Sequence, residues 1–207
     1  MSVISSRTQL ADVPEEYVRE LAAALGEDVE VTTRALDRFA IAIDASHYLA
    51  VPQALARPRT AHQVGMAMAL AVRSGWPLTF RSGGTSLSGQ AFSRGLTLDV
   101  RRHFRDIEIL DAGQRVRVQP GATVRQVNAR LAKYHTKLGP DPASEIACTI
   151  GGMIANNSSG MTCGTTANTY RTIDSMVIAL PSGTVIDTAR PKAGEVLANQ
   201  EPELVEV

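Results

Sequence analysis

Several residue types and patterns are scarce in this sequence, and each shortage excludes a class of protein. The 207 residues include two cysteines, Cys148 and Cys163, too few for a disulfide scaffold and without the spacing of common zinc sites. No apolar run approaches the roughly 20 residues that a membrane-spanning helix needs, and no secretory signal is visible. Acidic and basic residues number 21 each, so no excess charge favours nucleic acid or an anionic membrane. These shortages predict a cytoplasmic protein with no transmembrane segment, metal site or nucleic-acid partner.

The clearest secondary-structure pattern precedes residue 101. Thr60 and Gln63 form a capping box, and Gly75 is a stop signal. An extended segment is expected at residues 49–58 and an apolar helix at residues 61–74. Two strands are expected at residues 76–80 and 95–100. This order predicts a strand–helix–strand unit, and ligands bind at the carboxyl ends of strands in such folds.

Weaker patterns extend this organisation in both directions. Thr123 and Gln126 form a second capping box. A helix is expected at residues 14–28 and a mostly extended segment at residues 32–58. A hairpin at residues 107–120, a second helix at residues 122–134 and a second hairpin at residues 172–187 follow. The fold class is therefore α+β, in two small α/β lobes. We expect an N-terminal segment at residues 1–43, a first lobe at residues 44–100 and a second lobe at residues 101–190. Residues 191–207 would be the start of a following region.

The loop after the second strand of the unit, "RSGGTSLSG" at residues 81–89, is rich in glycine and hydroxyl side chains. It is neither a Walker A loop nor the dinucleotide fingerprint, because it has no Gly-Lys-Ser/Thr and no GxGxxG spacing. Successive backbone N–H groups with little side-chain bulk bind anions, most often phosphate. Arg81 would add charge there or form a salt bridge within the protein. The alternative is a surface loop whose glycines serve only a positive φ.

A second glycine-rich segment, "TIGGMIANNSSG" at residues 149–160, has a related composition. A helix beginning near Gly151 and Gly152 would give a second anion site and let a flat ligand approach. Asn156 and Asn157 carry donors and acceptors that suit the edge of a heterocycle, or they serve as cap and turn residues. The two segments together favour a ligand with a diphosphate and a flat ring, as in a dinucleotide cofactor.

Five motifs in register carry a family resemblance. They are "FRSGGTSLSGQ", "VQPGATVRQVNARLA", "GPDPAS", "TIGGMIANNSSG" and "LPSGTVID". From about Asp44 to Thr188 the chain resembles the FAD-binding domain of the FAD-linked oxidases related to vanillyl-alcohol oxidase and p-cresol methylhydroxylase. It is most similar to the branch of D-lactate, glycolate and D-2-hydroxyglutarate dehydrogenases. The resemblance implies the PCMH-type fold, with FAD held between the two lobes.

The resemblance also implies a role for each matched position. The diphosphate would be held around Arg81, Ser82, Gly83, Gly84, Thr85 and Ser86, with Leu87 and Gln90 nearby. Residues beside the flavin and its ribityl chain would be Pro140, Asp141, Ser144, Thr149, Ile150, Gly151 and Gly152. The loop that follows would contribute Ala155, Asn156, Asn157, Ser159, Gly160 and Gly164. The strand backbone at Ile178 would meet the adenine.

One position bears on how FAD is attached. Some relatives carry a histidine after the double glycine and bond the flavin there, whereas this chain has Thr85. The histidines lie outside both glycine segments, at positions 47, 62, 103 and 135. The resemblance therefore implies non-covalent FAD.

The resemblance implies oxidation of a D-2-hydroxy acid by hydride transfer to flavin N5. Members of this branch continue into a cap domain that binds the substrate, and we expect this chain to be an N-terminal fragment that lacks it. No catalytic side chain is assigned, and the electron acceptor is unknown. The alternatives are a non-catalytic FAD-binding fragment, or an electron-transfer FAD subunit that needs a partner.

Overall fold

The first lobe is built on a mixed sheet of four strands, in the order β1-β2-β4-β3. The computed structural model describes residues 14–204. The strands are β1 (Glu30–Thr32), β2 (Ala54–Arg57), β3 (Leu78–Arg81) and β4 (Leu96–Asp99). β2, β4 and β3 are parallel, and β1 is antiparallel to β2. The parallel part is the predicted strand–helix–strand unit, which is confirmed.

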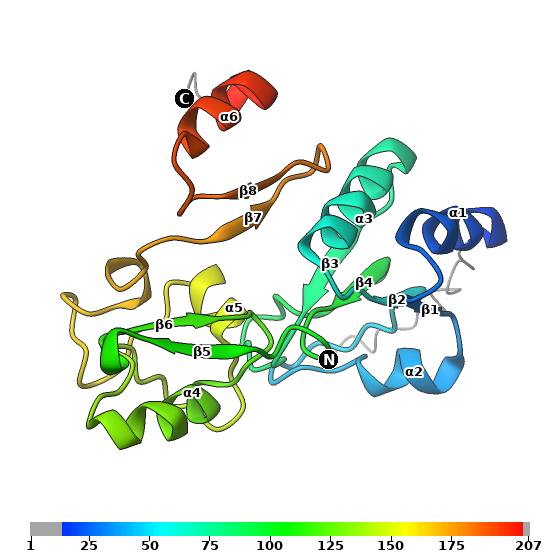
Figure 1. Ribbon diagram of the computed structural model, residues 1–207. Helices are drawn as coiled ribbons and strands as arrows, with labels where there is room; N and C mark the ends of the chain where they lie inside the picture. The colour runs from blue at the N-terminus through cyan, green and yellow to red at the C-terminus, as the bar shows by residue number, and fades with distance from the viewer. Residues whose placement is uncertain (1–13, 205–207) are drawn as a thin grey trace.

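Two helices cover one face of this sheet: α1 (Glu15–Leu25) and α3 (Ala61–Ser74) (Figure 1). α3 begins with the predicted capping box and ends at Gly75 in the left-handed conformation. Leu21 of α1 and Ala67 of α3 are fully buried, together with Leu98 of the sheet. The apolar helix predicted at residues 61–74 is therefore confirmed as a core element.

The structure corrects two expectations about the N-terminal part of the chain. Residues Ala35–Ala40, which we expected to be extended, form the short helix α2. Residues 15–43, which we expected to be a separate segment, belong to the first lobe, because β1 pairs with β2 and α1 packs against α3. Strand pairing and helix packing across this distance have no local sequence signal.

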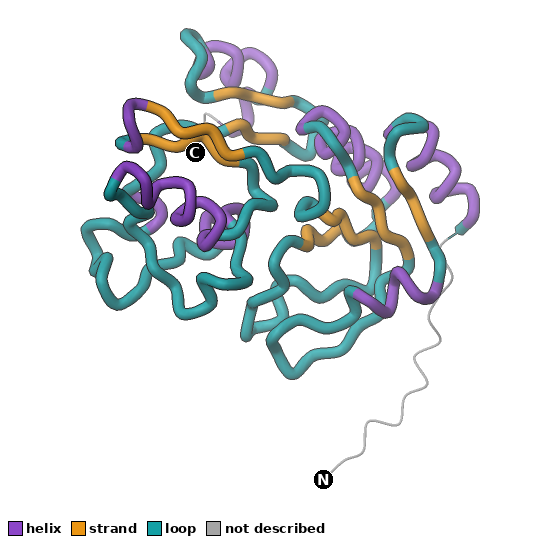
Figure 2. Tube along the Cα trace, turned by 60° about the horizontal axis from the view of Figure 1, so that its bottom comes forward, coloured by secondary structure: helices purple, strands orange, loops and turns teal. Residues whose placement is uncertain are grey.

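The second lobe contains the predicted hairpin, β5 (Ile107–Leu110) and β6 (Arg115–Val118), and the helices α4 (Val124–Leu131) and α5 (Ile150–Ala155). The capping box at Thr123 and Gln126 is confirmed. Short 3-10 turns follow β5, α4 and the second glycine segment, at Asp111–Gly113, Ala132–Tyr134 and Thr169–Arg171. A separate apolar core centres on Val124, Val127 and Met153. Figure 2 shows the two lobes side by side, with loops facing the gap between their ribbons.

The C-terminal hairpin, β7 (Val177–Ala179) and β8 (Val185–Asp187), lies against α3 (Figure 1), and Asp187 of β8 forms an ion pair with Arg117 of β6. A Cβ atom added at Gly65 of α3 would lie 2.7 Å from the carbonyl oxygen of Gly183 in the hairpin turn. The helix α6 (Ala193–Gln200) and a 3-10 turn at Pro202–Leu204 complete the described chain. No helix in residues 14–204 has the length and apolar character needed to cross a membrane.

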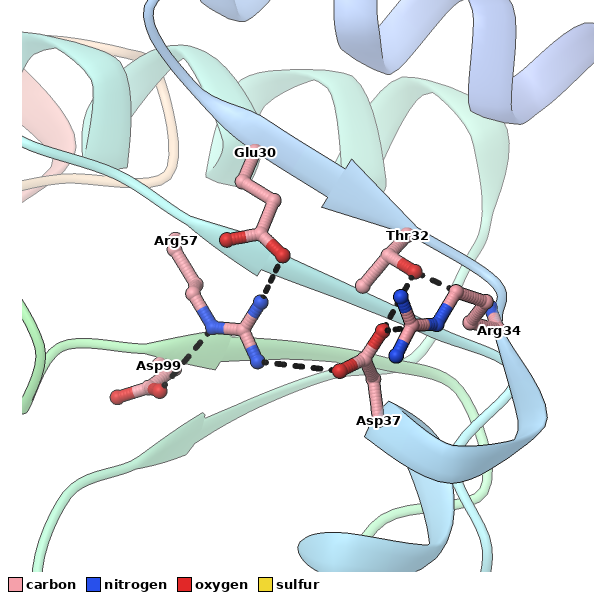
Figure 3. A network of polar contacts seen from close by, with 6 residues as sticks. All are labelled: Glu30, Thr32, Arg34, Asp37, Arg57 and Asp99. Atoms are coloured by element: carbon pink, nitrogen blue, oxygen red, sulfur yellow. Dashed lines mark hydrogen bonds and ion pairs between the residues drawn. The ribbon is translucent and has the colours of Figure 1, made fainter.

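A buried arginine joins three elements of the first lobe (Figure 3). The Arg57 side chain is 10% exposed and forms ion pairs with Glu30 of β1, Asp37 of α2 and Asp99 at the end of β4. Asp37 and Asp99 are about 20% exposed or less, whereas Glu30 is 47% exposed. The cluster therefore ties α2 to the sheet by charges that are largely removed from water.

Replacing Arg57 should destabilise the first lobe strongly. Arg57→Ala leaves the carboxylates of Asp37 and Asp99 without a buried counter-charge, which is expected to cost about 3 kcal/mol of unfolding free energy. Glu30→Gln, the control at the exposed partner, should cost less than about 1 kcal/mol. Urea unfolding measures both variants, and equal losses would contradict the account.

Candidate functional site

The two glycine-rich segments meet where the lobes touch. The Thr149 hydroxyl donates a 2.7 Å hydrogen bond to Ser82 Oγ, across 67 residues of sequence. Ser82 Oγ also lies 3.5 Å from the carbonyl oxygen of Pro120. A Cβ atom added at Gly83 would lie 2.7 Å from the carbonyl oxygen of Ala147. Backbone from one lobe therefore packs directly on backbone from the other, and glycine at position 83 permits this contact.

The fold places the first glycine segment at the carboxyl edge of the parallel strands. β3 ends at Arg81, which lies opposite Asp99 at the end of β4. The Val100 N–H donates a 3.0 Å hydrogen bond to the Arg81 carbonyl, which extends this pairing to the last residue of β3. The chain then leaves the sheet at Ser82, and ligands bind at this edge in open α/β sheets.

The loop presents unpaired donors. Among residues 14–204, the backbone N–H groups of residues 82–87 donate no hydrogen bond. Gly84 has a φ of 67°, in the left-handed region that favours glycine. Unpaired successive amides in such a turn form a concave anion site. Such donors are groups that can bind phosphate oxygens.

In this loop the Ser86 side chain forms hydrogen bonds within the loop, whereas the side chains of Leu87 and Thr85 do not. The Ser86 hydroxyl donates to Gln90 Oε1 at 3.0 Å and accepts from the N–H groups of Ser88 and Gln90, so it shapes the loop. Leu87 is 78% exposed. Within the described part of the chain, the Thr85 hydroxyl has no hydrogen-bond partner and stays available.

Arg81 is committed to the protein backbone. Its guanidinium donates to the carbonyl oxygens of Ile41 and Ile43, at 3.3 Å and 2.8 Å. Burial lowers the pKa of Arg81, while the nearby carboxylates of Asp44 and Asp99 favour its charged form. The side-chain contacts of Arg81 are therefore hydrogen bonds within the protein, to backbone carbonyls. No pattern in the sequence indicates that residues 41–45 lie beside the glycine loop.

The second glycine segment opens α5, as predicted. The Gly151 N–H donates to the Pro120 carbonyl at 2.9 Å, and a Cβ atom at Gly151 would lie 2.6 Å from the Pro120 ring. Gly152 is exposed, and a Cβ atom there would meet only Thr149 Oγ1 at 3.5 Å. Gly151 is therefore explained by packing, whereas Gly152 leaves open backbone on the surface of the segment.

Asp141 anchors the end of the second segment. Its carboxylate accepts hydrogen bonds from the Thr162 hydroxyl at 2.5 Å and from the Thr162 N–H at 3.2 Å. A Cβ atom at Gly160 would collide with Asp141. The hydrogen bond from the Thr162 hydroxyl is the main cause that holds the pKa of Asp141 below its ordinary value. Pro140, immediately before it, is fully buried.

The asparagines of the second segment form local structure. Asn157 has a φ of 49°, and its Oδ1 accepts from the Tyr170 N–H at 2.9 Å. Asn156 ends α5, and its Oδ1 accepts from the Ser158 hydroxyl at 2.6 Å. These contacts are typical of cap and turn residues, which is the alternative interpretation of both asparagines. Their amide nitrogens have no partner among the described residues.

The other predicted positions are spread more widely. The Ser144 carbonyl accepts from the N–H groups of Ala147 and Cys148, so Ser144 shapes the turn before the second segment. Gly164 has a φ of 55° and open space around it. Ile150 is buried, and Ala155 and Ser159 are exposed. Ile178 lies in β7 against α3, and the structure does not bring it to the glycine segments.

Both cysteines are free and buried, in agreement with the absence of a disulfide scaffold. In the part of the chain that the structure describes, no group of three or more His, Cys, Asp or Glu side chains is arranged to hold a metal ion.

Two α/β lobes that meet through glycine-rich backbone, with unpaired amides at a strand end, define a nucleotide-cofactor-binding module. Residues 52–189 match the family model described as "FAD binding domain", and the chain belongs to this family. Its fold is the PCMH-type fold of FAD-dependent oxidases, and FAD is its cofactor.

Two relatives illustrate the branch. The glycolate oxidase subunit GlcD of Escherichia coli (strain K12) is 35% identical over 57% of this chain and 24% of that protein. The D-2-hydroxyglutarate dehydrogenase of Haemophilus influenzae is 30% identical over 82% of this chain and 17% of that protein. The chain thus spans about a quarter or less of the length of these relatives.

Solved structures share the fold. A 6-hydroxy-D-nicotine oxidase from Arthrobacter nicotinovorans is 25% identical, with a TM-score of 0.71 over 88% of this chain and 39% of that one. An alkyldihydroxyacetonephosphate synthase is 19% identical, with a TM-score of 0.74 over 95% of this chain and 40% of that one. The predicted fold class and family are therefore confirmed.

The anchor at Asp141 has a pH signature. Because its pKa is lowered in the folded state, it stabilises the loop at pH values above its ordinary pKa of 3.8. That stabilisation is lost as the pH falls through the lowered pKa. Thr162→Val removes the donor hydroxyl and should raise the pKa of Asp141 towards 3.8, measured by NMR titration of its carboxyl carbon. An unchanged pKa would show that the Thr162 hydroxyl is not the cause.

Proposed function

We propose that this chain is the FAD-binding module of a flavin-dependent oxidoreductase that oxidises a D-2-hydroxy acid. The observation that supports it most is the meeting of two glycine segments around Ser82 and Thr149, beside unpaired amides at residues 82–87. Bound FAD would supply the hydride acceptor. The chain's own contribution is to bind FAD, orient it and exclude water from it.

In this proposal each segment has a separate task. The amides of residues 82–86 bind the diphosphate, with the Thr85 hydroxyl as a further donor. The exposed backbone of Gly152 allows the ribityl chain or the flavin to approach closely. Asp141, held by Thr162, fixes the position of the loop beside the flavin. Ile178 in β7 meets the adenine, and FAD binding uses residues 44–190.

The substrate class is inferred from the relatives. The relatives' names contain glycolate and D-2-hydroxyglutarate, which are both 2-hydroxy acids. This chain matches about a quarter or less of those proteins, so we place the substrate-binding groups in the cap domain, outside the matched part. No side chain of the module is assigned to proton transfer, and the electron acceptor is not assigned.

A second candidate is an FAD subunit that passes electrons within a larger assembly. The relative from E. coli is called a subunit of glycolate oxidase, which favours this possibility. Anaerobic addition of D-2-hydroxyglutarate or glycolate to the FAD-loaded chain tests whether the chain oxidises the substrate without a further domain or partner. Bleaching of the flavin supports substrate oxidation by the chain itself. A yellow spectrum that only dithionite bleaches supports a module or subunit that needs a partner.

FAD should be held without a covalent bond. Thr85 follows the double glycine and cannot form a histidyl–flavin bond. Acid precipitation of the yellow protein should release all of the flavin into the supernatant, as measured by its absorbance. Flavin that stays with the protein pellet would contradict the non-covalent proposal.

Gly84→Val should abolish FAD retention. A β-branched side chain at this position strains a φ of 67° and collides with the Arg81 guanidinium under the diphosphate loop. Gly75→Val is the matched control, because Gly75 has a φ of 66°, open space around it and no place in the site. Flavin content after gel filtration gives the comparison. Equal retention by the two variants would disprove the loop assignment.

A further inference from the structure

Residues 41–49, here called the strap, lie across the first glycine loop. An isolated antiparallel bridge between Ile43 and Leu49 closes the strap on itself. The Ala45 N–H donates a 3.0 Å hydrogen bond to the Gly84 carbonyl. Tyr48 stacks on Phe92, with ring centroids 5.4 Å apart. The strap therefore contacts the glycine loop at Gly84, and Tyr48 lies beside Gly89 at the end of the loop.

Arg81 fastens the other side of the strap. Its two terminal nitrogens donate to the carbonyl oxygens of Ile41 and Ile43, and the planar guanidinium fork suits two separated acceptors. The same guanidinium packs against Gly84, where an added Cβ atom would overlap its terminal nitrogen. Arg81 is thus enclosed between the strap and the turn of the loop.

The hydrogen bond from Ala45 fixes the direction of one donor of the loop. No cis peptide bond occurs in the described chain, so the Gly84 carbonyl and the Thr85 N–H point in opposite directions within their shared peptide plane. Because the carbonyl faces the strap, the Thr85 N–H faces away from it. The strap therefore orients a donor of the proposed diphosphate site.

We infer that Arg81 is a positioning residue for FAD, which acts through the strap and the turn at Gly84 and does not bind the diphosphate. The inference rests on the proposed function, because it assumes that residues 82–86 hold the diphosphate. It replaces the expected role of Arg81 as a direct partner of the cofactor. Its basis is that both terminal nitrogens of Arg81 already donate to backbone carbonyls.

A double-mutant cycle tests the packing of Arg81 on Gly84. FAD affinity is measured by flavin fluorescence for the wild type, Gly84→Ala, Arg81→Met and the double variant. Gly84→Ala should weaken binding more in the presence of Arg81 than in its absence, by about tenfold. Gly75→Ala, with the same backbone strain away from the loop, should leave affinity unchanged. An equal effect of Gly84→Ala in both backgrounds would overturn the inference.

Arg81→Lys separates positioning from a direct charge contact. Lysine keeps the charge, but its single ammonium group lacks the fork that reaches two carbonyls. We expect Arg81→Lys to weaken FAD binding as much as Arg81→Met, and the salt dependence of the affinity to stay that of the wild type. Affinity retained by the lysine variant, or a shallower salt dependence in Arg81→Met, would instead show contact with the diphosphate. A wild-type chain that binds no FAD would refute the proposed function itself.

Discussion

The close approach of Gly83 to the Ala147 carbonyl is the constraint on which the candidate site depends. No side chain fits between the two backbones, so the lobes meet at a fixed distance. The hydrogen bond between Thr149 and Ser82 holds the same contact from the side. Since β3 ends directly before this point, the sheet of one lobe and α5 of the other are both positioned by it. The donors of residues 82–87 consequently lie beside the second glycine segment.

Glycine stands at the positions of the two segments for different physical reasons. Gly83, Gly151 and Gly160 permit close packing, against Ala147, Pro120 and Asp141 respectively. Gly84 combines a left-handed conformation with a guanidinium packed beneath it. Gly152 alone in its segment faces open space without a positive φ, which suits the approach of a ligand. A glycine-rich cofactor loop is therefore as much a device for packing backbone on backbone as for exposing it.

Local signals in the sequence predict much of the fold. Contacts between residues far apart in the sequence leave no such signal. Capping boxes at Thr60 and Thr123 are formed by neighbouring residues, so both helix starts were predicted correctly. α2 begins at Ala35 with no side-chain cap from Arg34, and no local pattern marks it. The convergence of the two glycine segments followed from composition and the family resemblance. The contacts of Arg81 with Ile41 and Ile43 span about 40 residues, and nothing in the sequence indicated them.

Amide hydrogen exchange with and without FAD tests directly whether the two glycine segments bind the cofactor. The unpaired amides of residues 82–87 should exchange rapidly in the free chain, because they donate no hydrogen bond within the described protein. On addition of FAD they should become protected, together with the amide of Gly152. Protection confined to other parts of the chain, with residues 82–87 still exchanging rapidly, would contradict the claim that these two segments form the cofactor site.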